Sequence, residues 1–237
     1  AVSVDKMEKL FVAVKTLRAD VHILVDNCYG TFTEEKEPTA VGADVIMGSL
    51  IKNAGGGMAP TGGYIAGKKD LIERISFRLT IPGSGREVGS YAAGYRPFYQ
   101  GLFLAPHTVL QCLKTAMLFG EVFEYLGYAV MPRGDAKRAD VVESIRFKRP
   151  EELIAFCKAI QGASPIESDV VPEPWAMPGY ADPVIMAAGT FVQGATSELS
   201  ADGPIRPPYA VYIQGSLTYE HGRIALKEVV HAVTQDA

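Results

Sequence analysis

Apolar and polar positions follow two different periods along the chain, and these periods predict its helices and strands. Apolar residues recur at three- and four-residue spacing from Val4 to Leu17, which predicts an amphipathic helix. Two short apolar runs follow, His22 to Val25 and Asp44 to Ile51, and a polar residue comes directly after each of them. Short apolar runs joined by a longer connection are typical of parallel strands. The first half of the chain therefore predicts an α/β fold.

The second half has a different pattern. A proline is well tolerated in the first turn of a helix, so Pro106 is expected to open the longest helix, which would end near Tyr125. Beyond Val130 we expect a compact α+β arrangement of a strand, a helix and two further strands. These elements cover 141–147, a helix from Pro150, 187–190 and 209–214, while 200–209 is expected to be a loop.

Composition excludes several classes of protein. With 237 residues, 48% apolar and 21% charged, the chain is long enough to bury a core. A net charge of −4 without a Lys/Arg cluster gives no footprint for nucleic acid. No apolar run approaches the roughly 20 residues that span a bilayer, and no signal peptide opens the chain, so we expect no membrane partner. The widely spaced Cys28, Cys112 and Cys157 form no zinc or disulfide pattern, which favours a reducing cytoplasm and no metal.

Two ionisable residues follow the two apolar runs of the first half. Asp26 comes after the first run and Lys52 after the second, with Ser49 three residues before the lysine. Ligands of α/β sheets bind outside the carboxyl ends of the strands, where these residues would lie. A lysine in a partly dry pocket can form a Schiff base with the aldehyde of pyridoxal 5'-phosphate (PLP). In that case Asp26 would keep the pyridine nitrogen protonated, and Ser49 would donate to the phosphate. Read separately, a strand-end Asp is most often a turn residue and a surface Lys is most often solvated.

Several sequence motifs of this region resemble those of a known enzyme family. VDNCYGTF, VGADVIMGSLIKN and the glycine-rich turn after them resemble the fold type I PLP enzymes of cysteine and methionine metabolism. DNCYG, GSLIKNAGGG, APTGGYIAG and YQGLFLAPH are most similar to the methionine gamma-lyase-related family, often labelled aluminium resistance proteins. The resemblance covers almost the whole chain. It implies that the chain lacks the N-terminal portion of the family, with the phosphate-binding loop and the aromatic residue that stacks on the ring.

The resemblance also implies domains. Residues 1–104 would be the C-terminal part of the PLP-binding large domain, with its mixed or parallel sheet. Residues 105–129 would be a linking helix, and 130–237 a small C-terminal α+β domain. Such enzymes build their active sites across a subunit interface, so we expect a homo-oligomer, a dimer or a tetramer. A separate chain that carries the missing N-terminal portion is a further expected partner.

Further site residues are expected around this core. Asn27 would orient Asp26, and Cys28 belongs to the predicted cofactor-binding set, although a small core residue is the alternative for its thiol. The glycine-rich turn Asn53 to Gly57 is either a hairpin turn or a close approach of backbone to cofactor. The charged stretch from Thr33 to Pro38 is expected to be solvated.

An amino-acid substrate needs a cation for its carboxylate, and a bidentate arginine is suited to it. Arg206 is the first choice, with Arg223 as its competitor and Arg86 as a second contact to phosphate or substrate. The run R-x-S-x-G-x-E of better-known relatives is absent, and QGSLTYEH stands near its place without the arginine.

The resemblance implies a PLP-dependent carbon–sulfur lyase. It would act by β- or γ-elimination on a sulfur-containing amino acid such as methionine or cystathionine. The same residues also serve transamination, so an aminotransferase-like enzyme is an alternative. A non-catalytic or structural subunit that keeps the fold is another.

Overall fold

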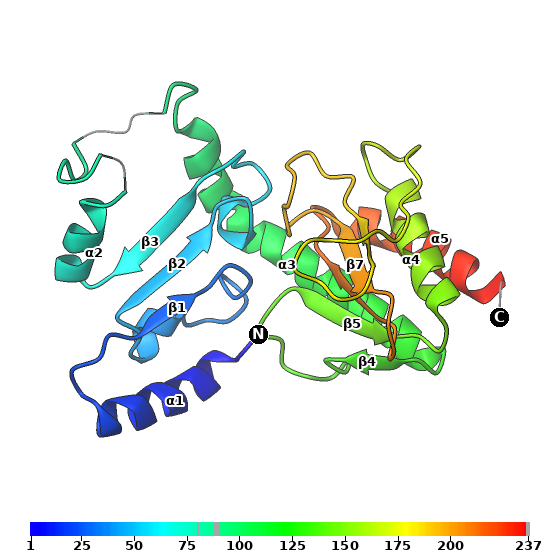
Figure 1. The fold of residues 1–237 in the computed structure, drawn as a ribbon, viewed down its shortest axis with the longest axis horizontal. Coiled ribbons are helices and arrows are strands. Elements are labelled where there is room, and N and C mark those ends of the chain that lie inside the picture. The colour runs from blue at the N-terminus through cyan, green and yellow to red at the C-terminus, as the bar shows by residue number, and fades with distance from the viewer. Residues whose placement is uncertain (80, 88–90, 236–237) are drawn as a thin grey trace. The chain divides into compact units, whose positions relative to one another are not determined.

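The computed structural model describes residues 1–79, 81–87 and 91–235. The chain divides into two compact units, Ala1–Pro106 and His107–Ala237. Each unit is built around its own sheet (Figure 1). The boundary between the units lies inside the longest helix, α3, Arg96–Tyr125.

The first unit contains a three-stranded sheet of order β1-β2-β3. Strand β1 runs parallel to β2 with Asp26 opposite Met47, which confirms the predicted parallel pair, and β3 is antiparallel to β2. The amphipathic helix α1 packs on the sheet through Phe11, which clusters with Ala43 and Ile46. The elements of this unit before α3 are α1 (Val4–Leu17), β1 (Leu24–Asp26), η1 (Pro38–Val41), β2 (Val45–Ser49), η2 (Asn53–Gly55), β3 (Gly63–Gly67) and α2 (Lys69–Ser76).

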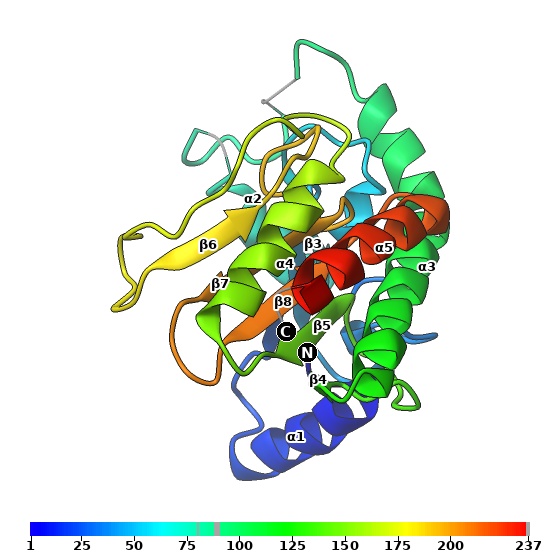
Figure 2. The same cartoon turned by 90° about the vertical axis from the view of Figure 1, so that its right-hand side faces the viewer.

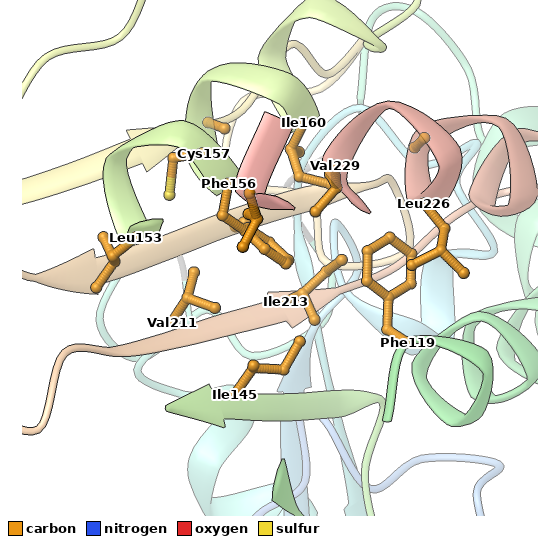
Figure 3. Packing of buried hydrophobic residues seen from close by; sticks show 14 of the residues in the cluster. Phe119, Ile145, Leu153, Phe156, Cys157, Ile160, Val211, Ile213, Leu226 and Val229 are labelled. Atoms are coloured by element: carbon orange, nitrogen blue, oxygen red, sulfur yellow. The ribbon is translucent and has the colours of Figure 1, made fainter. Parts of the chain in front are cut away.

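The second unit contains a five-stranded antiparallel sheet of order β4-β5-β8-β7-β6. Helices α4 and α5 lie side by side with the later part of α3 across one face of this sheet (Figure 2). Phe119 of α3, Phe156 of α4 and Val229 of α5 meet Ile145 and Ile213 of the strands in one buried core (Figure 3). The elements after α3 are β4 (Ala129–Met131), β5 (Val142–Arg146), α4 (Pro150–Gly162), β6 (Val184–Ala187), β7 (Ser200–Pro204), β8 (Ala210–Gln214) and α5 (Tyr219–Gln235).

Three predictions about the helices and strands were wrong. The strand expected at 187–190 lies instead at Val184–Ala187, where β6 pairs with β7. Helix α3 begins at Arg96, so Pro106 lies inside it, where proline removes one backbone hydrogen bond. The helix starts earlier because the Tyr95 carbonyl accepts the N–H groups of Phe98 and Tyr99. The expected loop 200–209 is half strand: β7 pairs with β6 on one side and β8 on the other, and this pairing overrides the turn propensity of its Asp and Gly.

Helix α3 also changes the expectation about membranes. By length and composition it is the one helix in the described ranges that could cross a bilayer, which the sequence did not lead us to expect. Several of its residues, however, are buried in the second unit. Cys112, Ala116, Phe119 and Phe123 are all at most 2% exposed. This burial is typical of the core helix of a folded domain.

Candidate active site

Two of the predicted site residues meet at the carboxyl ends of β1 and β2. Because these strands are parallel, Asp26 at the end of β1 and Ser49 at the end of β2 lie at the same edge of the sheet. Both line a cavity of about 390 Å³. The residues that line it are Asp26, Cys28, Met47, Gly48, Ser49, Gly63, Tyr64, Ile65 and Leu79.

Cys28 joins the two strand ends. Its N–H donates to Asp26 Oδ1 at 3.1 Å, and its Sγ accepts the N–H of Ser49 at 3.2 Å. Burial raises the pKa of the Cys28 thiol, and the nearby Asp26 carboxylate raises it further. The thiol is therefore mainly protonated at neutral pH, and its contacts connect the ends of the two strands.

Lys52 lies one turn beyond Ser49. The Ser49 carbonyl accepts the Lys52 N–H at 3.2 Å, and the lysine side chain is half-buried, with Nζ 5.5 Å from the centroid of the Tyr29 ring. Burial lowers the pKa of Lys52, as a reactive amine requires. Lys52 is not among the residues that line the cavity. The structure thus gathers Asp26, Cys28 and Ser49 around one cavity and places Lys52 just past it.

Asn27 is buried, and its side chain turns to other partners than Asp26. Its Nδ2 donates to Glu37 Oε2 at 2.6 Å and to Thr31 Oγ1 at 3.2 Å. Glu37 Oε1 also accepts the N–H of Phe32 at 2.9 Å, at a residue whose φ is 63°. The charged stretch was expected to be solvated, and for Glu37 this was wrong. Its carboxylate holds the turn after Asp26 in a conformation that non-glycine residues rarely adopt.

Tyr64 is a cavity residue that the sequence analysis missed. Its hydroxyl lies 2.7 Å from Thr31 Oγ1, which itself donates to the Asn27 carbonyl at 2.7 Å. Because the hydrogen of Thr31 is used there, Tyr64 must donate to Thr31, and it does so only as a neutral phenol. Burial raises the pKa of Tyr64, which agrees with this role. The only signal in the sequence is an aromatic residue within the short strand β3.

The glycine-rich turn after Lys52 packs against protein. A Cβ on Gly55 would lie 1.6 Å from the Leu50 carbonyl oxygen, and a Cβ on Gly56 would lie 2.3 Å from that of Gly101 in α3. Gly56 also has a φ of 57°. The close approach that these glycines allow is therefore between Leu50, the turn and α3.

The predicted arginines lie elsewhere in the fold. Arg86 is exposed in the loop after α2, and Arg223 is exposed on α5. Arg206 follows β7, pairs with Asp182 at 3.4 Å and lines a second cavity, of about 290 Å³, together with Arg146 of β5. Sequence analysis did not single out Arg146.

Gln214 is the first residue of QGSLTYEH, the stretch that the sequence analysis compared with the R-x-S-x-G-x-E run of better-known relatives. It lies at the end of β8, opposite Ser200, to whose Oγ its Nε2 donates at 3.3 Å. Arg206 follows the other end of the β7–β8 hairpin, so the two residues mark opposite ends of this pair of strands. Among the described residues, no group of three or more His, Cys, Asp or Glu side chains could hold a metal.

Comparison with known structures defines the class of protein. The chain has an α/β fold that matches roughly half of a fold type I PLP-dependent enzyme. A chain from Campylobacter jejuni that carries N'-pyridoxyl-lysine-5'-monophosphate is 15% identical with a TM-score of 0.57, over 96% of this chain and 60% of that one. At this identity the likeness shows the fold alone.

The family follows from closer matches. The family model described as Methionine gamma-lyase matches residues 1–234, and the chain belongs to this family. It is 52% identical to the uncharacterised protein YnbB of Bacillus subtilis (strain 168), over 98% of this chain and 55% of the relative. It is also 52% identical, with a TM-score of 0.92, to a carbon–sulfur lyase involved in aluminium resistance from Clostridium novyi NT, over 97% of this chain and 54% of that one. The chain thus spans about half the length of these relatives.

Proposed function

We propose that this chain carries the amine, the acid and a phosphate donor of a PLP-dependent carbon–sulfur lyase. The substrate would be a sulfur-containing amino acid such as methionine or cystathionine, cleaved by β- or γ-elimination. One observation carries the proposal. Asp26 and Ser49 end two adjacent parallel strands around one cavity, and a half-buried lysine follows one turn later at the same edge.

The residues at this edge fit the chemical groups of PLP. Asp26 provides a carboxylate for the pyridine nitrogen, Ser49 a hydroxyl for the phosphate and Lys52 an amine for the aldehyde. When bound, PLP supplies an electron sink for the carbanion that elimination requires. Asp26 holds the proton on the ring nitrogen, which strengthens that sink. Lys52 Nζ takes the proton from the substrate α-carbon, and burial, by lowering its pKa, makes the neutral amine available.

The overall reaction consumes one water and releases a thiol, a 2-oxo acid and ammonia. The description of the Clostridium novyi relative as a carbon–sulfur lyase supports this choice of reaction. For the substrate carboxylate we assign Arg206, which shares its cavity with a second cation, Arg146. Arg86 is the second assigned contact to phosphate or substrate.

The assembly is part of the proposal. Because the chain spans about half the length of its relatives, a complete site needs further residues. We assign them to a homo-oligomer, a dimer or a tetramer with the site at the subunit interface, or to a separate chain that carries the N-terminal portion of the family.

Turnover tests the proposed function. The purified protein, with PLP, would be incubated with methionine and with cystathionine, and both 2-oxo acid and ammonia would be measured. Equal amounts of both products are expected, with none from Lys52→Ala and an unchanged rate from Lys68→Ala, which removes an exposed lysine at the opposite end of the sheet. A 2-oxo acid formed without ammonia would indicate transamination. No product with either substrate, also in the presence of a chain that carries the N-terminal portion of the family, would favour a non-catalytic subunit.

A further inference from the structure

Asn53 follows Lys52 directly and is completely buried. It begins the short helix η2, for which Lys52 is the N-cap. Its Nδ2 donates to the Tyr29 carbonyl at 2.9 Å and to the Thr31 carbonyl at 3.1 Å. Both carbonyls belong to the turn that follows Asp26. One side chain therefore connects the turn that carries the lysine to the turn that carries the acid.

The chemistry of this contact requires an amide. Two carbonyl oxygens need two N–H groups, which the single nitrogen of an Asn side chain provides and which an Asp side chain lacks. Asn53 Oδ1, in contrast, is buried without a hydrogen-bond partner within the described residues. A buried polar atom without a partner opposes folding. Within the described residues, Asn53 thus uses both hydrogens of its amide nitrogen, while its amide oxygen has no hydrogen-bond partner.

The turn after Lys52 and the turn after Asp26 each have further contacts besides those of Asn53. Gly55 packs against the Leu50 carbonyl and Gly56 against the Gly101 carbonyl of α3, so neither position has room for a side chain. On the other side, Glu37 holds Asn27 and Phe32, and Tyr64 holds Thr31. Asn53 lies between these two pieces of backbone, and its hydrogen bonds connect them directly.

We propose that Asn53 is a positioning residue that sets the Lys52 amine relative to the Asp26 carboxylate for PLP. This inference rests on the proposed function, in which both residues bind the cofactor. Asn53 touches neither the amine nor the carboxylate through its donors. It acts through the backbone of the two turns.

Asn53→Leu tests the inference, because leucine has nearly the same shape and no donors. Asn53→Ala, which adds no bulk, gives the same answer if leucine does not fit. The control is Gln161→Leu in the second unit, which removes another buried amide that donates to a carbonyl, that of Glu167 at 2.8 Å, and accepts the Ala188 N–H at 3.0 Å. All variants would be compared in thermal stability, in PLP affinity, in the absorbance maximum of bound PLP and in backbone hydrogen exchange over residues 27–33.

Both Asn53 variants are expected to bind PLP about tenfold or more weakly, to shift the absorbance maximum, and to exchange faster over residues 27–33. Gln161→Leu should lose comparable stability and keep wild-type affinity, spectrum and exchange. Wild-type affinity and spectrum in a folded Asn53 variant would overturn the inference and leave the proposed function intact. A wild-type protein that takes up no PLP would overturn the proposed function. Backbone hydrogen exchange over residues 27–33 can also be measured without PLP. If the Asn53 variants exchanged there at the wild-type rate, the inference would be overturned.

Discussion

The first sheet has an aspartate at each end, and the two differ in exposure and in the partners of their carboxylates. Asp44, just before β2, is 1% exposed. It pairs with Lys15 at 3.2 Å and with Lys68 at 2.5 Å, and it accepts the N–H of Ile23 at 2.7 Å. Asp26, at the end of β1, is exposed and lines a cavity, and its Oδ1 accepts the N–H of Cys28.

This difference separates an acid that holds the fold together from one that is suited to a ligand. Burial disfavours the charge on Asp44, but its bonds to Lys68, Ile23 and Lys15 outweigh burial and hold the pKa of that carboxyl well below its usual range. Its oxygens are already occupied by Lys15 of α1, by the Ile23 N–H just before β1 and by Lys68 just before α2. Asp26 instead presents its carboxylate to a cavity. The same residue type is therefore structural at one edge of the sheet and a candidate for chemistry at the other.

The largest effect is expected from removing the buried acid. Asp44→Ala should lower the free energy of unfolding by about 3 kcal/mol, because it leaves the Ile23 N–H without its acceptor and breaks two ion pairs. Urea unfolding followed by circular dichroism measures this. Asp26→Ala is the matched control, and its loss should stay within about 0.5 kcal/mol. If both variants lost the same free energy of unfolding, Asp44 would be no more important for the fold than Asp26, and the comparison would be wrong.

The same contrast predicts how stability depends on pH. Because folding depresses the pKa of Asp44, its contribution is fully present above the unfolded pKa of about 4 and is lost as the pH falls below it. The stability difference between wild type and Asp44→Asn should therefore be constant from pH 5 to 7 and shrink below about pH 4. Unfolding curves at several pH values check this. A difference that grows on acidification would show that the Asp44 carboxyl is not stabilised in its charged form.

Removing the exposed acid should affect the ligand and leave the fold intact. Asp26→Asn is expected to weaken PLP binding by about tenfold to a hundredfold, because a charge-assisted hydrogen bond to the ring nitrogen is lost. Absorbance titration with PLP measures the affinity. Asp44→Asn, at a pH where it is still folded, should bind with wild-type affinity. If Asp44→Asn impaired binding more than Asp26→Asn, the assignment of the two edges would be wrong.

The smallest effect concerns the thiols. Burial raises the pKa of Cys112 to about 12 and that of Cys157 further still, whereas Cys28 is partly exposed beside the cavity. Iodoacetamide should label Cys28 alone in the folded protein, and the other two only after unfolding. Saturating PLP should slow the labelling of Cys28 several-fold. Mass spectrometry of the alkylated peptides identifies the labelled cysteines. If PLP left the labelling rate of Cys28 unchanged, the ligand would bind away from Cys28.

The sequence predicts the backbone of the site better than its supporting contacts. Asp26 and Lys52 could be placed at one edge because each follows an apolar run, and the pattern of the runs predicts parallel strands. Ser49 could be placed beside them because it lies three residues before the lysine. The contacts of Tyr64 and Asn53 could not be placed, because they join positions far apart in the sequence. Those of Glu37 are local, but they depend on the positive φ of Phe32, which an aromatic residue does not signal. In the second unit Glu143, a fully buried acid on β5, accepts a hydrogen bond from its near neighbour Arg138 at 2.6 Å. Only the fold shows that a Cβ on Gly120 would lie 2.7 Å from Glu143 Oε2, so that this glycine leaves room for the pair.

Borohydride trapping tests directly whether Lys52 forms a Schiff base with PLP. The purified protein would be incubated with PLP, reduced with borohydride, digested and mapped by mass spectrometry. We expect a pyridoxyl adduct on Lys52, together with loss of an absorbance band near 420 nm. Lys15 and Lys68, paired with Asp44, are the internal controls and should remain unmodified. No adduct on Lys52, or one equally abundant on Lys68, would contradict the assignment of the β1–β2 edge as the cofactor site.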